Sequence, residues 1–431
     1  MCRGGEYDVL IVGSGAGGAT LARELSNRGK AVLVVEKGTR AKKLGSFRHT
    51  LPYFDVNAVT KTPRRSSEGV ILWRTLMAGG STVVSCGNAT RCLEKELADL
   101  GVDLDHAFRE AEQEMRVAPI EEELLSGGSR RVRDASRGLG YAMDPMPKFI
   151  DPVRCKRCGQ CVFGCPTDAK WTAVKPLDEA VAAGAEVVFG TAVETVSIEN
   201  GKAVGVEAAG SRGEPVRLRG DAVVLCAGGF GSPAILQRLG FEDAGSGLFI
   251  DLFVNTYGVA DGANMLGEPP MALVCHDVYE EKGFILSTYV NQPRLVRLME
   301  LGPKGMTLPG NRLIGLMIKS RDDAVGQVRA DGSVSKPVTD ADQARLHEGA
   351  SISTEILVKA GAKRESIVVS APQGAHPGGT AAIGRIVNED LQTRVDNLFV
   401  CDGSVLPAAP GMPPILTIVA LAKRLAAHLA G

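Results

Sequence analysis

The sequence predicts an α/β protein (α+β overall), in which a doubly wound, Rossmann-type nucleotide-binding domain is joined to a second domain that also contains a sheet. A short apolar run at residues 7–12 is followed by the glycine-rich turn GSGAGG. A segment with helical spacing and a second apolar run at residues 30–36 come next, so strand, turn, helix and strand fit within about thirty residues. The 431 residues are also enough for two or three domains.

Each predicted element rests on its pattern of apolar residues. Residues 7–12 (YDVLIV) and 30–36 (KAVLVVE) read as buried parallel strands, because they are short and almost continuously apolar. Between them, Leu21 and Leu25 stand four residues apart, as on one face of a helix. Further elements follow the same patterns: a helix and then a strand at 176–200, a buried strand at 221–226, a strand from residue 397 and a helix at 414–429.

The turn after the first strand carries a dinucleotide fingerprint. Gly13, Gly15 and Gly18 form G-x-G-x-x-G, in which the glycines allow a tight turn, close approach to a pyrophosphate and close packing of the helix. The N-terminus of that helix offers free N–H groups to the phosphates. Glu36 ends the second strand, where its carboxylate can accept hydrogen bonds from the adenosine ribose. The fingerprint predicts nucleotide binding but does not separate FAD from NAD.

Composition narrows the function classes. The net charge of −1 gives no basic footprint for nucleic acid or an anionic membrane. The sequence has no apolar run approaching the ~20 residues that span a bilayer, and its first residues lack the pattern of a signal peptide. We therefore expect a cytoplasmic protein without a transmembrane segment, with peripheral membrane contact left open.

A cysteine run stands apart from the remaining cysteines. Cys155, Cys158, Cys161 and Cys165 with Pro166 give C-x₂-C-x₂-C-x₃-C-P, the bacterial ferredoxin run. Zinc sites more often split their ligands into two separated pairs. We therefore predict a [4Fe–4S] cluster within a small inserted segment at 145–175, with zinc as the alternative. The fourth ligand is either Cys165 or a remote cysteine such as Cys86 or Cys92.

Five blocks in order resemble the glucose–methanol–choline (GMC) oxidoreductase family of flavoproteins. They are GSGAGGATLARELSNRGKAVLVVEKG near the N-terminus, AGGSTVVSCGNATR (78–91), CAGGFGSPAIL (226–236), AHPGGTAAIG (375–384) and NLFVCDGSVLPAAPGMPPILTIVALA (397–422). The resemblance is weakest over about 240–370. It implies a discontinuous FAD-binding domain at 1–240 and 371–431, with a trimmed substrate or cap domain at 241–370. GCPTDAK at 164–170 is similar to a block in some GMC-like long-chain alcohol oxidases and dehydrogenases.

The resemblance also implies which residues surround FAD. They lie at turns against the pyrophosphate and the flavin, beside the adenine, near the ribityl chain and at the start of the last helix. These residues are Gly79, Gly80, Ser81, Val193, Gly228, Asp402, Ser404, Pro414 and Ile415.

One histidine is the candidate base. His376, in AHPGGT, matches the family position that faces the flavin N5, and imidazole titrates near working pH. The family usually places a second His or Asn just before the proline that opens the last helix, but here Pro413 stands there. Asn88 and His276 are the residues that could substitute.

These features predict an FAD-dependent dehydrogenase rather than an oxidase. It would oxidise a small CH–OH substrate by hydride transfer and relay electrons through the cluster to a carrier protein or partner subunit. Two alternatives stay open. One is a reductase of an unsaturated or carbonyl substrate, and the other is a non-catalytic electron-transfer subunit of a larger complex.

Overall fold

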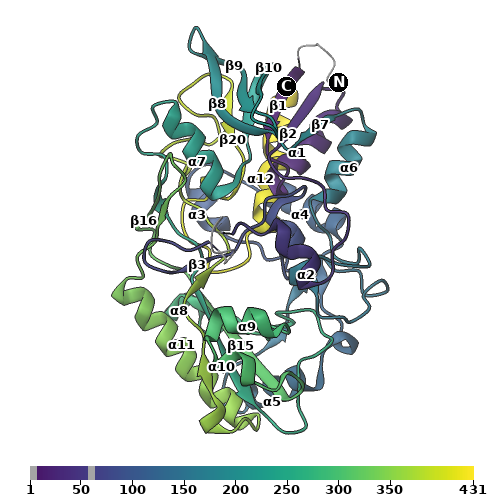
Figure 1. The fold of residues 1–431 in the computed structure, drawn as a ribbon, viewed down its shortest axis with the longest axis vertical. Helices are drawn as coiled ribbons and strands as arrows, with labels where there is room; N and C mark the ends of the chain where they lie inside the picture. Colours follow the sequence, from purple (N-terminus) through teal and green to yellow (C-terminus); the bar gives the residue numbers. More distant parts are fainter. Residues whose placement is uncertain (1–6, 57–63) are drawn as a thin grey trace.

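The computed structural model describes residues 7–56 and 64–431. Two main sheets form the framework, the first in the upper part of Figure 1 and the second in the lower part. The first has the order β7-β2-β1-β10-β9-β8, and β20 also pairs with β10. Its strands are β1 (Tyr7–Val12), β2 (Val32–Glu36), β7 (Glu186–Phe189), β8 (Ala192–Glu199), β9 (Lys202–Ala209), β10 (Pro215–Leu225) and β20 (Leu398–Val400).

Strands β7, β2, β1, β10 and β20 run parallel, which confirms the predicted doubly wound arrangement. Every residue of β2 is buried, as expected for a valine-rich strand covered on both faces. The predicted strands at 7–12 and 30–36 and the predicted last helix are present, the last as α12 (Ile415–Ala430). Parallel strands end at one edge of the sheet, so the loops after β1, β10 and β20 meet there.

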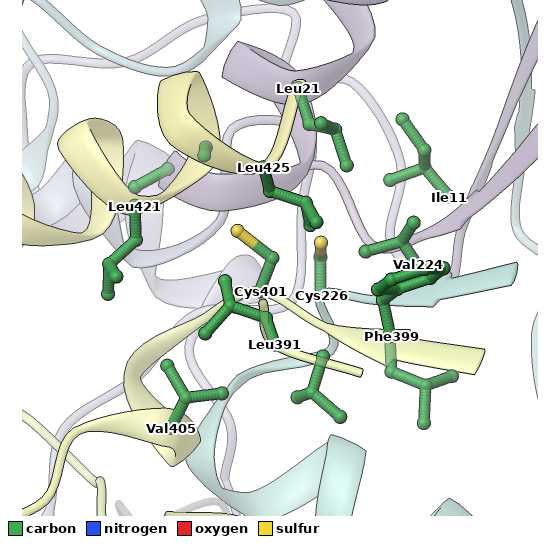
Figure 2. Packing of buried hydrophobic residues seen from close by; sticks show 14 of the residues in the cluster. Ile11, Leu21, Val224, Cys226, Leu391, Phe399, Cys401, Val405, Leu421 and Leu425 are labelled. Atoms are coloured by element: carbon green, nitrogen blue, oxygen red, sulfur yellow. The ribbon is translucent and has the colours of Figure 1, made fainter. Parts of the chain in front are cut away.

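Helices α1 (Ala16–Asn27) and α12 pack against each other beside this sheet. Figure 2 shows their leucines Leu21, Leu421 and Leu425 around the apolar side chains of β1, β10 and β20. Cys226 and Cys401 lie in the same core and act as small buried apolar residues. Further helices in the first part of the chain are α2 (Phe47–Thr50), α3 (Glu94–Asp99), α4 (Asp105–Met115), α6 (Val174–Ala182) and α7 (Gly228–Arg238).

The second sheet has the order β3-β19-β12-β15-β14-β13-β5, with β18 also paired to β12. Its strands are β3 (Ile71–Leu72), β5 (Asp144–Pro145), β12 (Phe253–Val259), β13 (Leu273–Cys275), β14 (Phe284–Thr288), β15 (Leu313–Ser320), β18 (Val368–Val369) and β19 (Gln373–Gly374). The central strands come from the predicted cap segment at 241–370, while β3, β5 and β19 come from outside it.

Helix α11 (Asp340–Lys359) packs against β12, β14 and β15, so one face of the second sheet is covered. It begins at a capping box, in which Thr339 and Asp342 satisfy each other's backbone N–H groups. The other helices around the second sheet are α5 (Gly127–Arg137), α8 (Tyr279–Lys282), α9 (Arg294–Leu301) and α10 (Lys304–Thr307). The part of the chain that the structure describes also has two small sheets. One is made of β11 (Ser246–Leu248), β16 (Gly326–Val328) and β17 (Val334–Ser335), and the other of β4 (Ala118–Pro119) and β6 (Pro147–Lys148).

Candidate active site

A cavity of about 660 Å³ is lined by residues of both main sheets. The first sheet contributes the loops that follow β1, β10 and β20. The second contributes the face of β12 and β15 that carries Phe253, Met317 and Lys319. The cavity therefore has two parts. The loops of the first sheet form the nucleotide edge, and the chamber is the partly apolar part lined by Phe253, Met317 and Lys319.

The glycines of the fingerprint have distinct surroundings. A Cβ on Gly13 would lie 2.4 Å from the Cys226 carbonyl oxygen, and one on Gly18 would lie 2.0 Å from the Gly13 carbonyl oxygen. A larger residue fits at neither place, because backbone would have to move. A Cβ on Gly15 would meet nothing within 4 Å, since this residue faces the cavity. Gly15 is therefore where backbone can approach a bound pyrophosphate.

Glu36 ties the fingerprint turn to the end of β2. One carboxylate oxygen accepts hydrogen bonds from Ser14 N and Ser14 Oγ, at 2.9 and 2.7 Å. The other accepts one from Gly38 N at 2.6 Å. Ser14 Oγ also accepts a bond from Gly79 N at 3.2 Å, which draws the predicted second glycine turn to the first. Ser14 was not singled out from the sequence, although it lies within the fingerprint.

Asp402 joins the loops after β10 and β20 in the same way. Its Oδ2 accepts hydrogen bonds from Gly228 N (2.8 Å) and Ser232 Oγ (2.5 Å), and its Oδ1 accepts one from Ser404 N (2.8 Å). The side chain thus fixes two cavity-lining loops that are far apart in the sequence. The predicted cofactor residues that line the cavity are Gly13, Gly15, Glu36, Gly80, Ser81, Val193, Gly228, Asp402, Pro414 and Ile415. Those that stand behind the lining are Gly18, Gly79 and Ser404.

Helices α1, α7 and α12 begin at the cavity, because their first residues or N-caps line it. A helix N-terminus presents free N–H groups and a partial positive charge. The arrangement suits phosphates at one end and a ring system that gains negative charge at the other.

His376 lies on the cavity wall, and its Nδ1 is 2.8 Å from Oδ2 of Asp251. The Asp251 carboxylate is fully buried and also accepts a hydrogen bond from Gly411 N at 2.8 Å. A carboxylate at Nδ1 favours the tautomer with its proton there, which leaves Nε2 as the ring nitrogen that can accept a proton. Burial and the nearby Lys319 charge lower the pKa of His376 well below its usual value, so the ring is neutral at pH 7.

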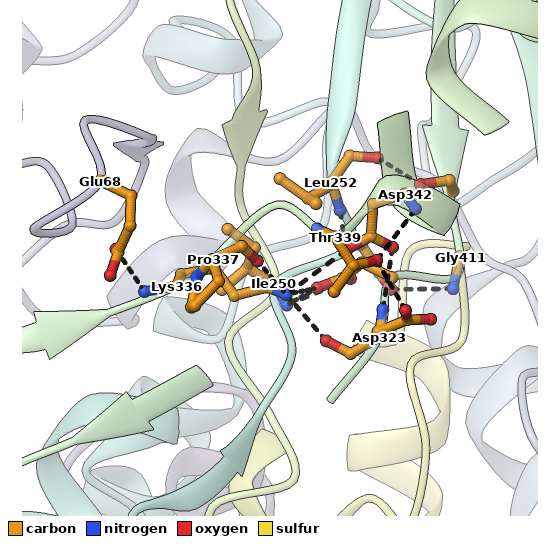
Figure 3. A network of polar contacts seen from close by, with 12 residues as sticks. Glu68, Ile250, Leu252, Asp323, Lys336, Pro337, Thr339, Asp342 and Gly411 are labelled. Atoms are coloured by element: carbon orange, nitrogen blue, oxygen red, sulfur yellow. Dashed lines mark hydrogen bonds and ion pairs between the residues drawn. The ribbon is translucent and has the colours of Figure 1, made fainter. Parts of the chain in front are cut away.

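A buried ion pair holds Asp251 in place. The Asp322 carboxylate accepts hydrogen bonds from the backbone N–H groups on both sides of Asp251, Ile250 at 3.1 Å and Leu252 at 3.2 Å. Lys336 Nζ lies 3.0 Å from Asp322, and neither side chain is exposed. Figure 3 shows this network from Lys336 across to Gly411. Asp251 has a φ of 49°, a conformation that non-glycine residues adopt only where surrounding contacts impose it.

Lys319 is a second charged group on the chamber wall. It is 2% exposed, lines the cavity, and its Nζ lies 4.5 Å from the centre of the Phe253 ring. Within residues 7–56 and 64–431 it makes no hydrogen bond or ion pair within 4.0 Å. Burial lowers its pKa, while the nearby Asp251 raises it. Neither Asp251 nor Lys319 was singled out from the sequence. The one available signal was a lysine at the end of the apolar run 313–318.

Comparison with known proteins decides the family. The N-terminal and C-terminal family models, both described as GMC oxidoreductase, match residues 7–252 and 328–422. The chain belongs to the GMC oxidoreductase family. A relative of 30% identity is an uncharacterized protein of Methanocaldococcus jannaschii, aligned over 97% of this chain and 98% of its own length. A long-chain-alcohol oxidase of Arabidopsis thaliana is 23% identical over 98% of this chain and 68% of its own.

The fold agrees with this assignment. The crystal structure of pyridoxine 4-oxidase from Mesorbium loti superposes with a TM-score of 0.74 at 16% identity, covering 98% of this chain and 99% of that one. The nucleotide edge of this GMC protein fits FAD, the cofactor of the family. Gly15 leaves its backbone open, Glu36 stands at the end of β2, and helix N-termini face the space between.

The site departs from the usual GMC pattern where the sequence indicated. Pro413 lines the cavity and offers no polar side chain. Asn88 also lines it, but its side chain already contacts Lys148 Nζ and, at 3.1 Å, the sulfur of Met271. His276 is exposed beyond β13 and is not among the lining residues. Lys319 is therefore the better placed polar partner for His376 in this GMC protein.

The cysteine run adjoins the cavity through Val162 and Phe163, which line it. Cys161 is buried, Cys158 is exposed, and Cys155 and Cys165 are intermediate. In the described part of the chain, no group of three or more His, Cys, Asp or Glu side chains is placed to hold a metal ion. The four thiols of this run therefore do not converge on one metal position in the described structure. Burial raises the pKa of Cys165, but hydrogen bonds from the Thr167 hydroxyl and from the backbone N–H groups of Lys170, Thr167 and Ala169 lower it, so that the net shift is downward.

No helix in the described ranges combines the length and the apolar character needed to cross a bilayer.

Proposed function

We propose that this GMC protein is an FAD-dependent oxidoreductase that oxidises the CH–OH group of a small substrate bound in the chamber beside His376. The observation that carries the proposal is the pairing of His376 with the fully buried Asp251 on the wall of a cavity that also fits FAD. FAD bound at the nucleotide edge would supply the hydride acceptor.

His376 takes the hydroxyl proton at Nε2 as the carbinol carbon loses its hydride. The ring is neutral before reaction because its pKa is lowered by burial and by the Lys319 charge. Asp251 keeps the proton of Nδ1 directed away from the chamber and offsets the charge that the ring gains.

Lys319 holds the substrate oxygen in place of the missing second residue at Pro413. Its ammonium group is buried, points to a chamber with low dielectric and has no hydrogen-bond acceptor of its own among the described residues. A cation near the carbinol oxygen stabilises the negative charge that develops as the proton leaves.

We also propose a [4Fe–4S] cluster on Cys155, Cys158, Cys161 and Cys165, separately from the reaction in the chamber. The spacing of the run, the N–H groups around Cys165 and the position of the run beside the cavity support it. The thiols would have to converge on binding, so no step of the reaction is assigned to the cluster. Anaerobic purification with iron and sulfide analysis tests it, and a flavin spectrum without iron, or with zinc, would remove the cluster.

With such a cluster the protein would act as a dehydrogenase that delivers electrons to a carrier protein or partner subunit. The assay compares reoxidation of the reduced protein by O₂ with reoxidation by a one-electron dye. Fast reoxidation by O₂ alone would assign the protein to the oxidases instead.

Anaerobic substrate screening tests the main proposal. Primary and secondary alcohols are added to the FAD-loaded protein, and bleaching of the flavin absorbance is followed. His376→Ala should abolish substrate-dependent bleaching but leave reduction by dithionite unchanged. The reductase alternative would be favoured if α,β-unsaturated compounds restored the flavin absorbance of the dithionite-reduced protein while alcohols caused no bleaching. Equal bleaching by wild type and His376→Ala would refute His376 as the base.

A further inference from the structure

The chamber contains a buried carboxylate that the proposed reaction does not use. Glu300, on α9, is 4% exposed and lines the cavity. No ion pair to it is formed within the described residues, and burial raises its pKa to about 7. The nearby Arg297 is turned away from it, because its guanidinium donates to the backbone carbonyls of Asn291, Gln292 and Gly305.

Neutral polar side chains hold this carboxylate in position. Tyr257 donates its hydroxyl to Oε2 at 2.8 Å, and Asn291 donates its side-chain amide to Oε1. Tyr289 in turn donates to Asn291 Oδ1 at 2.9 Å. Tyr289 and Asn291 also line the cavity, so a polar surface centred on Glu300 faces the chamber.

A second buried polar group, the side-chain amide of Asn255, lies beside Glu300. The amide of Asn255 is close enough to lower the pKa of Glu300, yet neither Nδ2 nor Oδ1 completes a hydrogen bond. Asn255 is fully buried. Asn255 does not line the cavity, so a ligand in the chamber meets the Glu300 carboxyl group and not this amide.

The strand register places this surface away from the reacting end. Lys319 lies directly opposite Phe253 in the antiparallel pair β12–β15. Asn255 is two residues further along β12, on the same face, which corresponds to about 7 Å. The Glu300 carboxylate beside Asn255 is therefore on the order of 10 Å from the Lys319 ammonium group. The chamber has a lysine at one end and a buried carboxyl group at the other.

We infer that the chamber selects an amino alcohol, whose protonated amine binds Glu300 while its hydroxyl group lies between Lys319 and His376. The inference rests on the proposed function and names its substrate class. Beside an apolar chain end the Glu300 carboxyl stays desolvated with a raised pKa, and it makes no ionic contact. An ammonium group favours the ionised carboxylate and donates several hydrogen bonds to it.

The test compares 6-amino-1-hexanol with 1-hexanol and 1,6-hexanediol in anaerobic flavin reduction by the FAD-loaded protein. We expect a KM for the amino alcohol roughly 10- to 100-fold below that of either neutral compound, the range for one hydrogen bond to a charged group. Glu300→Gln, which keeps the shape, should remove this preference. Glu280→Gln, at an exposed position on α8, should keep it.

A second measurement does not require turnover. Hexylamine should raise the melting temperature of the wild type and compete with 6-amino-1-hexanol, and neither effect should survive in Glu300→Gln. This readout with the wild type alone still decides the matter if Glu300→Gln fails to fold.

The outcomes separate the two proposals. If alcohols bleach the flavin with no preference for the amine, the substrate class is wrong and the proposed function stands. If hexylamine binds through Glu300 but no alcohol bleaches the flavin, the proposed function is wrong and the amine site stands. An equal preference for 1,6-hexanediol would overturn the cationic ligand.

Discussion

Replacing Asp251 by Asn tests the orientation of the base. The side chain keeps its shape, but its amide group can place a donor against His376 Nδ1, where the structure has a 2.8 Å contact to a carboxylate oxygen. The imidazole would then keep its proton on Nε2 and could not accept one in the chamber. The charge that normally offsets the protonated ring is lost as well.

The magnitude follows from charge and distance. With the charge centres about 4 Å apart and an effective dielectric constant of about 20, the attraction between carboxylate and imidazolium is about 4 kcal/mol. That corresponds to a rate loss of nearly a thousandfold if it acts fully in the transition state. Burial raises the pKa of Asp251 to about 7, so the carboxylate forms as pH rises through that value. Wild-type flavin reduction should therefore rise across pH 6–8, and Asp251→Asn should lose that rise.

Anaerobic stopped-flow measurement of flavin bleaching at saturating substrate provides the assay. Asp261→Asn, an exposed carboxylate in the same domain, is the matched control and should keep the wild-type rate and pH profile. The FAD content of both variants shows whether they fold. An Asp251→Asn protein with normal FAD content and a wild-type rate would refute the reasoning.

Three further predictions concern other groups on the cavity wall. Lys319→Met should slow flavin reduction by about 10²-fold or more through loss of the cation near the substrate oxygen, with Lys319→Arg partly restoring it, and an unchanged rate would remove Lys319 from the site. Gly15→Val should abolish FAD binding without unfolding the protein, because its side chain enters only the cavity; flavin absorbance per protein is measured, with Gly127→Ala as the control at an open helix position. The pKa of Glu300 is raised from 4.5 to about 7, so its burial favours the folded state below pH 4.5 and this contribution is lost as pH rises to 7. Between pH 5 and pH 8 the free energy of urea unfolding should therefore fall by about 2 to 3 kcal/mol less in Glu300→Gln than in the wild type, and an identical pH dependence would contradict the raised pKa.

The nucleotide half of the site could be predicted from the sequence because local physics dictates it. Gly13 and Gly18 are required by backbone contacts with no room for a Cβ, and that requirement leaves a readable pattern. The buried strands β1 and β2 can likewise be recognised in the sequence as apolar runs. A family resemblance then placed His376, which the structure sets on the cavity wall.

The substrate half could not be predicted in this way. Asp251, Lys319 and Glu300 are brought together by strand pairing and helix packing across long sequence distances. In the sequence each is an isolated charged residue, and most charged residues in proteins lie on solvated surfaces. Only their burial in the folded chain shows that their charges need partners.

The role of the cysteine run also depends on more than spacing. The four residues match the ferredoxin pattern, and cluster binding stays a prediction because the thiols are not gathered around a metal position in the described residues. Metal binding and local folding are commonly coupled, so direct iron and sulfide analysis decides the question.

The most direct measurement is the anaerobic reduction of the FAD-loaded protein by an alcohol that carries deuterium on its carbinol carbon. If the chamber oxidises CH–OH groups, the flavin bleaches with both isotopic forms and more slowly with the deuterated one, and His376→Ala removes the bleaching. If the protein binds FAD but no alcohol bleaches it, or the bleaching proceeds equally well without His376, then the chamber does not perform this reaction.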